Sequence, residues 1–263
     1  MGNLVVKDNA LIEASHKLSE VEQRLILLAI LKGREFCDSI EQLKDKELII
    51  HASDYMNAFG VDRDASYKSL KKAVLGLFEA KWGYRTINSK GNMEVRYERF
   101  TQSAVYVENE ATVKFMFANA IIPMLVELER NFTSYEIAQV ANLQSRYAMR
   151  LYECLIRFKT SKTLTISLAE LRFRFGLLDT EYKAMGDFKK FVLDLAVKQI
   201  NTNTDITVSY EQHKQGRTIT GFTFKFKAKP KPKSAKALKD ERDLNTMDMF
   251  VSMTDNQRFA FAK

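Results

Sequence analysis

Paired lysines recur at the same place in two related stretches of this sequence. Lys71-Lys72 lies in the first stretch and Lys189-Lys190 in the second, each within a segment of helical periodicity. Ammonium groups donate charge-assisted hydrogen bonds to phosphate oxygens and to the O6 and N7 atoms of guanine. Unrelated surface charges have no reason to recur at one motif position, so we expect these lysines to contact nucleic acid.

The two stretches, residues 50–75 and 166–193, are copies of one motif about 116 residues apart. Each copy predicts a short helix, a Phe-Gly-aliphatic turn and a longer helix that begins with lysines. This order is that of a helix-turn-helix, whose second helix reads DNA. Two copies therefore predict two DNA-binding modules.

Each long helix has a predicted inward stripe and an outward face. Leu70, Val74 and Leu77 form the stripe of the first helix (67–81), and Phe188, Val192 and Leu195 that of the second (181–199). The side chains predicted to meet DNA are polar and point outward: from the first helix Tyr67, Lys68, Lys71 and Lys72; from the second Lys183, Asp187, Lys189 and Lys190. Asp187 either accepts a hydrogen bond from a cytosine amino group or only caps and repels, and each lysine could instead be a solvated surface charge.

A β-hairpin is predicted after each helix-turn-helix. Runs 84–87 and 95–100 flank a polar tip at 88–92, and runs 206–210 and 218–226 flank a tip at 213–217. The predicted fold class is therefore α+β and helix-rich, with two tandem winged-helix domains. The wing-tip candidates for DNA contact are Lys90, Lys214 and Arg217. Phe222, Phe224 and Phe226 alternate along one strand, which favours a core role over base stacking.

Other local signals complete the predicted elements. Capping boxes are predicted at Ser19–Glu22 and Thr133–Glu136, and Gly33 suits a helix C-cap. Residues 48–50, 111–117 and 163–166 predict strands, and 121–128 predicts a helix. In the predicted helix 144–159, Arg146, Arg150, Glu153 and Arg157 share one face, and Arg146 and Arg150 are candidates for phosphate contacts.

Positive charge is concentrated in the second module. Residues 1–131 carry 18 Lys and Arg against 19 Asp and Glu, whereas residues 132–233 carry 18 against 9. We expect the second module to supply most of the phosphate-derived affinity. The predicted domains are 4–130, 131–228 and a basic linker with a flexible tail at 229–263. Within the tail, 257–261 loosely resembles peptides that dock on bacterial sliding clamps, the alternative being a plain surface helix.

The motifs of common enzymes and metal sites are missing from the sequence. It has no phosphate-binding loop, no zinc-ligand spacing and no nucleophile elbow, and its histidines, His16, His51 and His213, are far apart. Ten tyrosines leave a strand-transfer nucleophile open by count, without an evident set of Arg and His groups around one. We therefore expect no catalytic residues, no cofactor and no metal. Cys37 and Cys154 are read as reduced buried thiols of a cytoplasmic protein, and no apolar stretch predicts a membrane partner.

Several stretches, in order, resemble the replication initiators of iteron-bearing bacterial plasmids. They are 5–14 with 18–24, 143–153, 188–190, 200–206 and 221–224, and the resemblance covers roughly residues 4–228. It implies binding of double-stranded DNA at direct origin repeats, opening of AT-rich DNA, and recruitment of the host initiator and replicative helicase. It also implies a homodimer, paired largely through the first domain, that represses its own gene.

Two other functions stay open at this point. One is a dimeric winged-helix transcriptional repressor without an initiator role, and the other is a nicking or strand-transfer enzyme. Whether the natural chain continues past Lys263 is open as well.

Overall fold

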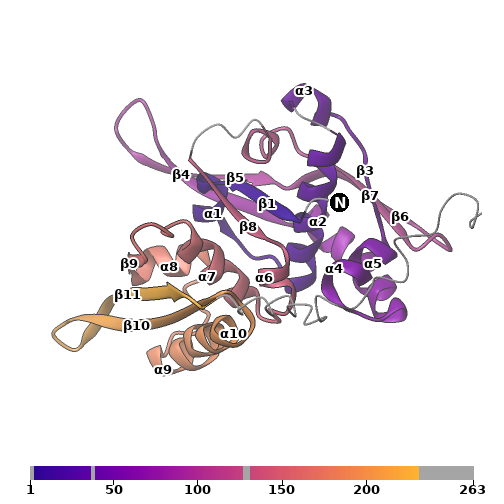
Figure 1. Ribbon diagram of the computed structural model, residues 1–263. Coiled ribbons are helices and arrows are strands. Elements are labelled where there is room, and N and C mark those ends of the chain that lie inside the picture. The colour runs from indigo at the N-terminus through magenta and orange to yellow at the C-terminus, as the bar shows by residue number, and fades with distance from the viewer. Residues whose placement is uncertain (1–2, 37–38, 127–130, 231–263) are drawn as a thin grey trace, which may run out of the picture. The chain divides into compact units, whose positions relative to one another are not determined.

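The computed structural model describes residues 3–36, 39–126 and 131–230 (Figure 1). The expectations for Cys37, for residues 127–128 and for the tail beyond 230 lie outside the described residues. Residues 1–228 form one compact unit, and the second unit starts at Lys229.

The first winged helix is built from elements between Glu20 and Phe117. Its helices are α2 (Glu20–Phe36), α3 (Ile40–Leu43), α4 (Ala52–Phe59) and α5 (Arg63–Glu79), and its sheet strands are β3 (Leu48–His51), β6 (Thr101–Val107) and β7 (Thr112–Phe117). The strands follow the order β3–β7–β6, with Leu48 opposite Phe115. The α4–turn–α5 unit is the predicted helix-turn-helix, which the structure confirms.

The sequence prediction chose the wrong hairpin as the first wing. The chosen hairpin, β4 (Lys81–Ile87) with β5 (Met93–Arg99), pairs with β2 (Ser15–His16) in a separate sheet. The strand that precedes the helix-turn-helix pairs instead with β7, so the wing is β6–β7. Its tip carries Glu108 and Glu110 rather than lysine. Local patterns predict hairpins but not which distant strand joins them.

The second winged helix repeats the first without the inserted hairpin. Its elements are α7 (Arg146–Ile156), β9 (Thr163–Ser167), α8 (Leu168–Arg174), a long helix from Met185 to Asn203, β10 (Ile206–Gln215) and β11 (Thr218–Ala228). The sheet order β9–β11–β10 matches that of the first module. Phe222, Phe224 and Phe226 are all buried, which confirms their predicted core role.

A segment at the N-terminus pairs across the sequence with residues that follow the first module. β1 (Leu4–Asp8) and β8 (Phe132–Glu136) are antiparallel, with Val5 opposite Tyr135. The capping box predicted at Thr133–Glu136 is therefore wrong, because these residues form a strand. The chain between these strands and the two modules contains α1 (Asn9–Glu13), the 3-10 turn Ile122–Met124 and α6 (Ala138–Ala141). The domain boundary at 130 and 131 stays a prediction.

The start of α2 agrees with its predicted cap, but the end does not. The Ser19 backbone N–H donates to Glu22 Oε2 at 2.7 Å, and the Glu22 N–H donates to Ser19 Oγ at 3.4 Å. The capping box is therefore confirmed. Gly33 is not a C-cap, because α2 continues to Phe36.

A buried polar seam joins the N-terminal segment to the second module. The Arg150 guanidinium donates to the carbonyl oxygens of Ile12 and Ala14, both at 2.8 Å, and to that of Arg174 at 3.2 Å. Glu153 accepts from Lys7 Nζ at 2.6 Å and from Arg150 at 3.1 Å. These bonds compensate charges that would otherwise be costly to bury.

The second Phe-Gly turn fits closely against the same N-terminal segment. A Cβ on Gly176 would lie 2.4 Å from the His16 carbonyl oxygen. The His16 ring is 8% exposed and packs edge-on against Phe100. The two modules thus meet through backbone as well as through side chains.

Replacing Gly176 by alanine should destabilise the protein more than replacing Gly60 by alanine. Both glycines have a φ of 62°, so an alanine would cost about 1–2 kcal/mol at either turn. A Cβ on Gly60 would meet no other described residue within 4 Å, whereas one on Gly176 would clash with His16 backbone. Urea denaturation of both variants measures the difference. Equal free energies of unfolding would contradict the close contact.

Stability should fall as the pH drops through the range in which free histidine titrates. Burial, followed by the charges of Arg150 and Lys7, holds the pKa of His16 well below its usual value of 6.5. The unfolded chain takes up a proton there and the folded chain does not, so stability present above pH 6.5 is lost below it. We expect a loss of about 2 kcal/mol between pH 7 and pH 5.

Urea denaturation at the two pH values tests this expectation. His16→Phe should flatten the dependence, and His213→Gln, at an exposed wing position, should keep it. Equal pH dependence in wild type and His16→Phe would show that His16 is not the group responsible.

Candidate nucleic-acid interface

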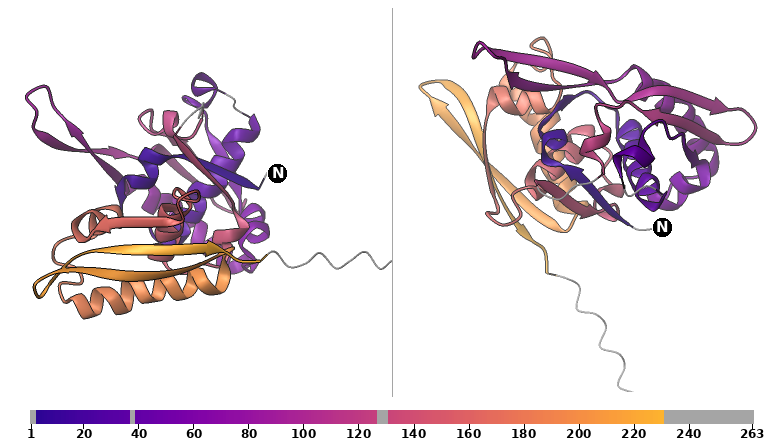
Figure 2. Two further views of the ribbon diagram at one scale, coloured as in Figure 1. Left: turned by 60° about the vertical axis from the view of Figure 1, so that its left-hand side comes forward. Right: turned by 90° about the horizontal axis from the view of Figure 1, so that it is seen from above.

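The second recognition helix is one continuous helical run with a π-helical middle. It comprises α9 (Met185–Asp187), the π segment Phe188–Asp194 and α10 (Leu195–Asn203), and it lies along β10 and β11 (Figure 2). It begins at residue 185 rather than at the predicted 181. The Arg172 guanidinium explains the difference, because it donates to the carbonyl oxygens of Leu178 and Glu181 at 2.8 and 2.6 Å and holds that stretch as a loop.

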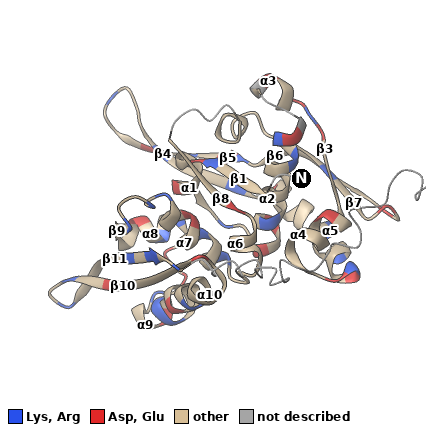
Figure 3. Cartoon of the chain, in the orientation of Figure 1, with Lys and Arg blue, Asp and Glu red and all other residues tan. Residues whose placement is uncertain are grey.

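The predicted contact residues of the second module are mostly accessible. Figure 3 marks Lys and Arg positions in blue on the ribbon of this helix and on the β10–β11 hairpin. Lys183, Asp187 and Lys190 are exposed. Lys189 is half-buried and its Nζ donates to Gln212 on β10 at 3.3 Å, so this lysine lies toward the wing. Lys190 Nζ lies 5.1 Å from the centre of the Phe191 ring. The wing-tip residues, Lys214 and Arg217, are also exposed.

The predicted inward stripe of this helix is only partly right. Phe188 and Val192 are fully buried, but Leu195 is 40% exposed. Leu193 and Ala196 are buried instead. The π segment has i→i+5 hydrogen bonds and more residues per turn than an α-helix, so it shifts the phase of every residue that follows.

The first recognition helix, α5, runs from 63 to 79 rather than over the predicted 67–81, but its inward stripe is as predicted. Leu70, Val74 and Leu77 are buried, which confirms the stripe, and Lys68 and Lys72 are exposed. Asp62 caps the helix by accepting from the Ala65 N–H at 3.0 Å.

Two α5 candidates contact the true wing of the first module. The Tyr67 ring packs edge-on against Tyr106 with centroids 5.5 Å apart. Lys71 Nζ lies 4.7 Å from the centre of the Tyr106 ring and 3.3 Å from a Glu108 oxygen. Both partners are on the solvent side, so this ion pair is weak and leaves Lys71 able to exchange Glu108 for a phosphate.

The middle of the charged row on α7 is buried, because Arg150 and Glu153 are each 3% exposed. The Arg150 guanidinium is bound to three carbonyls, so the assignment of Arg150 to phosphate contact is wrong. Arg146 is half-buried, and its guanidinium donates to the Tyr147 hydroxyl at 2.5 Å. Residue types alone could not reveal this, because the N-terminal segment that covers the row is more than 130 residues away in sequence.

One predicted contact residue, Lys90, lies outside both recognition helices, and the sequence analysis missed two cations that lie on them. Lys90 is exposed at the tip of the inserted β4–β5 hairpin, and its role stays a prediction. Arg63 at the start of α5 and Lys198 on α10 are exposed cations on recognition helices. Extending the outward face by one turn at the ends of the predicted helices would have found both.

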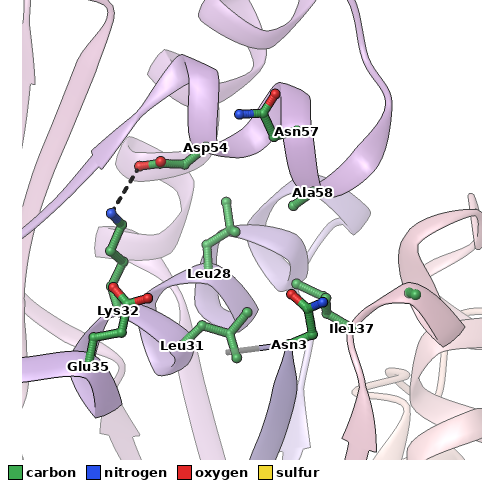
Figure 4. Close-up of a pocket in the computed structure, with 10 residues that line it drawn as sticks. Asn3, Leu28, Leu31, Lys32, Glu35, Asp54, Asn57, Ala58 and Ile137 are labelled. Atoms are coloured by element: carbon green, nitrogen blue, oxygen red, sulfur yellow. Dashed lines mark ion pairs between the residues drawn. The ribbon is translucent and has the colours of Figure 1, made fainter. Parts of the chain in front are cut away.

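A cavity of about 600 Å³ lies beside the helix-turn-helix of the first module (Figure 4). Leu28, Leu31 and Lys32 of α2 line one side, and Asp54 of α4 lies 3.6 Å from Lys32 Nζ. Asp54 also accepts from the His51 backbone N–H at 3.1 Å. This carboxylate caps α4, which gives it a structural role.

Within residues 3–36, 39–126 and 131–230, no three His, Cys, Asp or Glu side chains are grouped to hold a metal ion. None of the helices in that part of the chain is long and apolar enough to cross a membrane. Cys154, the described cysteine, is buried and free, and burial raises the pKa of its thiol.

Two family models match the chain in sequence order. The model described as "Initiator Replication protein, WH1" matches residues 4–156, and "Initiator Rep protein, WH2" matches residues 167–226. The chain belongs to the initiator replication protein family. It is a replication initiator with two winged-helix domains.

The relatives of this initiator each match more than four fifths of its length. A "Replication initiation protein" of Escherichia coli is 25% identical over 82% of this chain and 67% of the relative. An "Uncharacterized 27.6 kDa protein" of Escherichia coli is 25% identical over 81% of this chain and 91% of the relative. The crystal structure of Pi initiator protein in complex with iteron DNA has the same fold, with a TM-score of 0.69, 19% identity and coverage of 87% of this chain and 98% of the other.

Reversing two charges on the second recognition helix should abolish specific DNA binding by this initiator. Lys189→Glu with Lys190→Glu replaces two cations on the proposed DNA face by anions. We expect affinity for origin DNA to fall on the order of a hundredfold or more. A gel-shift titration measures the affinity, and circular dichroism checks that the fold survives.

Lys44→Glu with Lys46→Glu is the matched control. These exposed lysines follow α3 in the first module, and the substitution changes the net charge by the same amount. The control should bind DNA much more tightly than the Lys189 and Lys190 variant. Wild-type affinity in that variant would show that another helix binds the DNA.

Proposed function

We propose that this initiator binds direct repeats in a plasmid origin as a monomer, with both recognition helices on one duplex. The main support is the presence of exposed lysines on two helix-turn-helix units that belong to one family of initiators. The similar Pi protein was crystallised with iteron DNA. Gly60 and Val61, which precede α5, line the same cavity of about 480 Å³ as Gln199 and Asn203 at the end of α10. The start of α5 and the end of α10 therefore lie near each other, which supports the proposal that both helices contact one DNA site.

The proposed contact residues are the accessible members of the predicted set. They are Tyr67, Lys68, Lys71, Lys72, Lys90, Arg146, Lys183, Asp187, Lys189, Lys190, Lys214 and Arg217. To these we add Arg63 and Lys198. Seven of the twelve cations in this set belong to the second module, which supports a larger phosphate contribution from that module.

The proposed mechanism makes and breaks no covalent bond. Binding to repeats holds the initiator beside AT-rich DNA, helps open it, and recruits the host initiator and replicative helicase in the bacterial cytoplasm. The free energy for strand opening comes from binding several repeats, so no nucleotide cofactor is required of this chain.

We also propose a homodimer that represses the gene of the initiator. An exposed apolar row on the β4–β5 hairpin supports pairing through the first module, since such rows mark interaction sites. Its members are Ile87, Met93, Val95 and Tyr97. The family and the relatives give no support to a repressor without an initiator role.

Footprinting of the full chain on the plasmid DNA next to its gene tests the proposal. We expect protected direct repeats at a regular phase, because one monomer fills each repeat. Purified chain with Mg²⁺ should leave supercoiled plasmid intact, and a point mutation in the repeats should lower plasmid replication.

Protection of a single palindrome, with no direct repeat bound, would favour the repressor and contradict the initiator mechanism. Nicks in the plasmid or a covalent tyrosyl–DNA adduct would contradict the mechanism without bond cleavage.

A further inference from the structure

Two large apolar side chains are exposed on the second recognition helix. Phe191 is 47% exposed and Leu195 is 40% exposed. They are four residues apart, so they lie side by side on the helix surface. The core side of this helix is already filled by other residues: Phe188, Val192, Leu193, Ala196 and Ile200. Packing within the domain therefore does not explain the exposed pair.

Lysines outnumber carboxylates in the chain around this apolar pair, with four lysines against two aspartates between residues 183 and 198. Lys190 Nζ lies 5.1 Å from the centre of the Phe191 ring, and Lys183 and Lys198 are exposed before and after it. Asp194 is engaged by the Tyr210 hydroxyl at 2.7 Å. A surface of this sign is complementary to a polyanion.

The backbone has an unusual conformation at the same place. Phe191 lies within the π segment Phe188–Asp194, as do Lys189 and Lys190. π-helical turns are rare and occur frequently at functional sites. Here the π turns bring Phe191 and Leu195 out of the core while the lysines stay accessible.

The chemistry of the major groove offers an apolar partner. Thymine presents a 5-methyl group at that edge, and cytosine, guanine and adenine do not. A phenyl ring held beside a lysine can cover this methyl group while the ammonium group reaches a phosphate or a guanine. Asp187, four residues before Phe191, is suited to a base amino group rather than to a phosphate.

We propose that Phe191, supported by Leu195, packs against thymine methyl groups and determines the sequence specificity of the second module. The inference rests on the proposed function, because it requires that this helix enters the major groove of the repeat. Lysine contacts to phosphates alone would give affinity without distinguishing thymine from cytosine.

Replacing thymine by uracil in the DNA tests the contact directly, since it removes only the methyl group. The probe is a duplex that carries one footprinted repeat, with each thymine replaced in turn. For the full-length wild type we expect uracil at one or two positions to weaken binding about fourfold, the value of one buried methyl group. For Phe191→Ala, thymine and uracil at those positions should bind equally.

Two variants serve as controls. Phe191→Leu keeps an apolar side chain and should keep part of the preference for thymine. Ile49→Ala removes an exposed apolar side chain from β3 of the first module and should keep all of this preference.

Three results separate the possible failures. Wild-type binding that ignores uracil at every position, or a preference for thymine that survives in Phe191→Ala, contradicts this inference alone. Failure of the wild type to bind any repeat contradicts the proposed function itself. If Phe191→Ala binds DNA like the wild type but does not support plasmid replication, the pair serves a protein partner and the inference is wrong.

Discussion

The guanidinium of Arg150 ties the N-terminal segment to the second winged helix. It reaches the backbone at Ile12 and Ala14 in the N-terminal segment and the last residue of α8 in the second module. Burial alone would raise the pKa of Glu153, but the charges of Lys7 and Arg150 lower it, so the carboxylate stays ionised. Removing Glu153 would leave Lys7 and Arg150 buried without their carboxylate partner, which is far costlier than losing an exposed ion pair.

Side chains of α2 also join the first module to the chain that follows it, by donating to backbone carbonyls. Arg24 donates to the carbonyls of Ala141 and Leu143 at 2.7 and 3.4 Å, and Gln23 donates to that of Arg146 at 3.3 Å. Such bonds depend on where the backbone lies, so they define an orientation and not merely an association. Because α8 is bound in this way, the recognition helix that follows it is positioned relative to the first module. A protein that must place two helices on one duplex needs this kind of joint.

The sequence predicted the features that depend on nearby residues. The two helix-turn-helix units, the Ser19 cap, the α5 stripe and the second hairpin all follow from local periodicity and turn chemistry. The failures concern pairing across long distances. Nothing local distinguishes β4–β5 from β6–β7 as the wing, and nothing in the strand Phe132–Glu136 names Leu4–Asp8 as its partner. The sequence analysis placed Arg150 on the surface because the residues that share its helix face are charged. The segment that buries it, which contains Ile12 and Ala14, is more than 130 residues away in the sequence.

The predicted inward stripe of the second recognition helix was partly wrong for a different reason. An α-helical wheel places Leu195 with Phe188 and Val192, and a wheel was the only guide available from the sequence. The π segment adds residues to the turns between them, so Leu193 and Ala196 enter the core and Leu195 leaves it. The hydrophobic residues of this helix thus exceed what its core side can hold. This helix is also rich in lysine. We expect the apolar side chains that its buried side cannot hold to face the ligand. In the major groove, these side chains can distinguish bases that the lysines alone cannot.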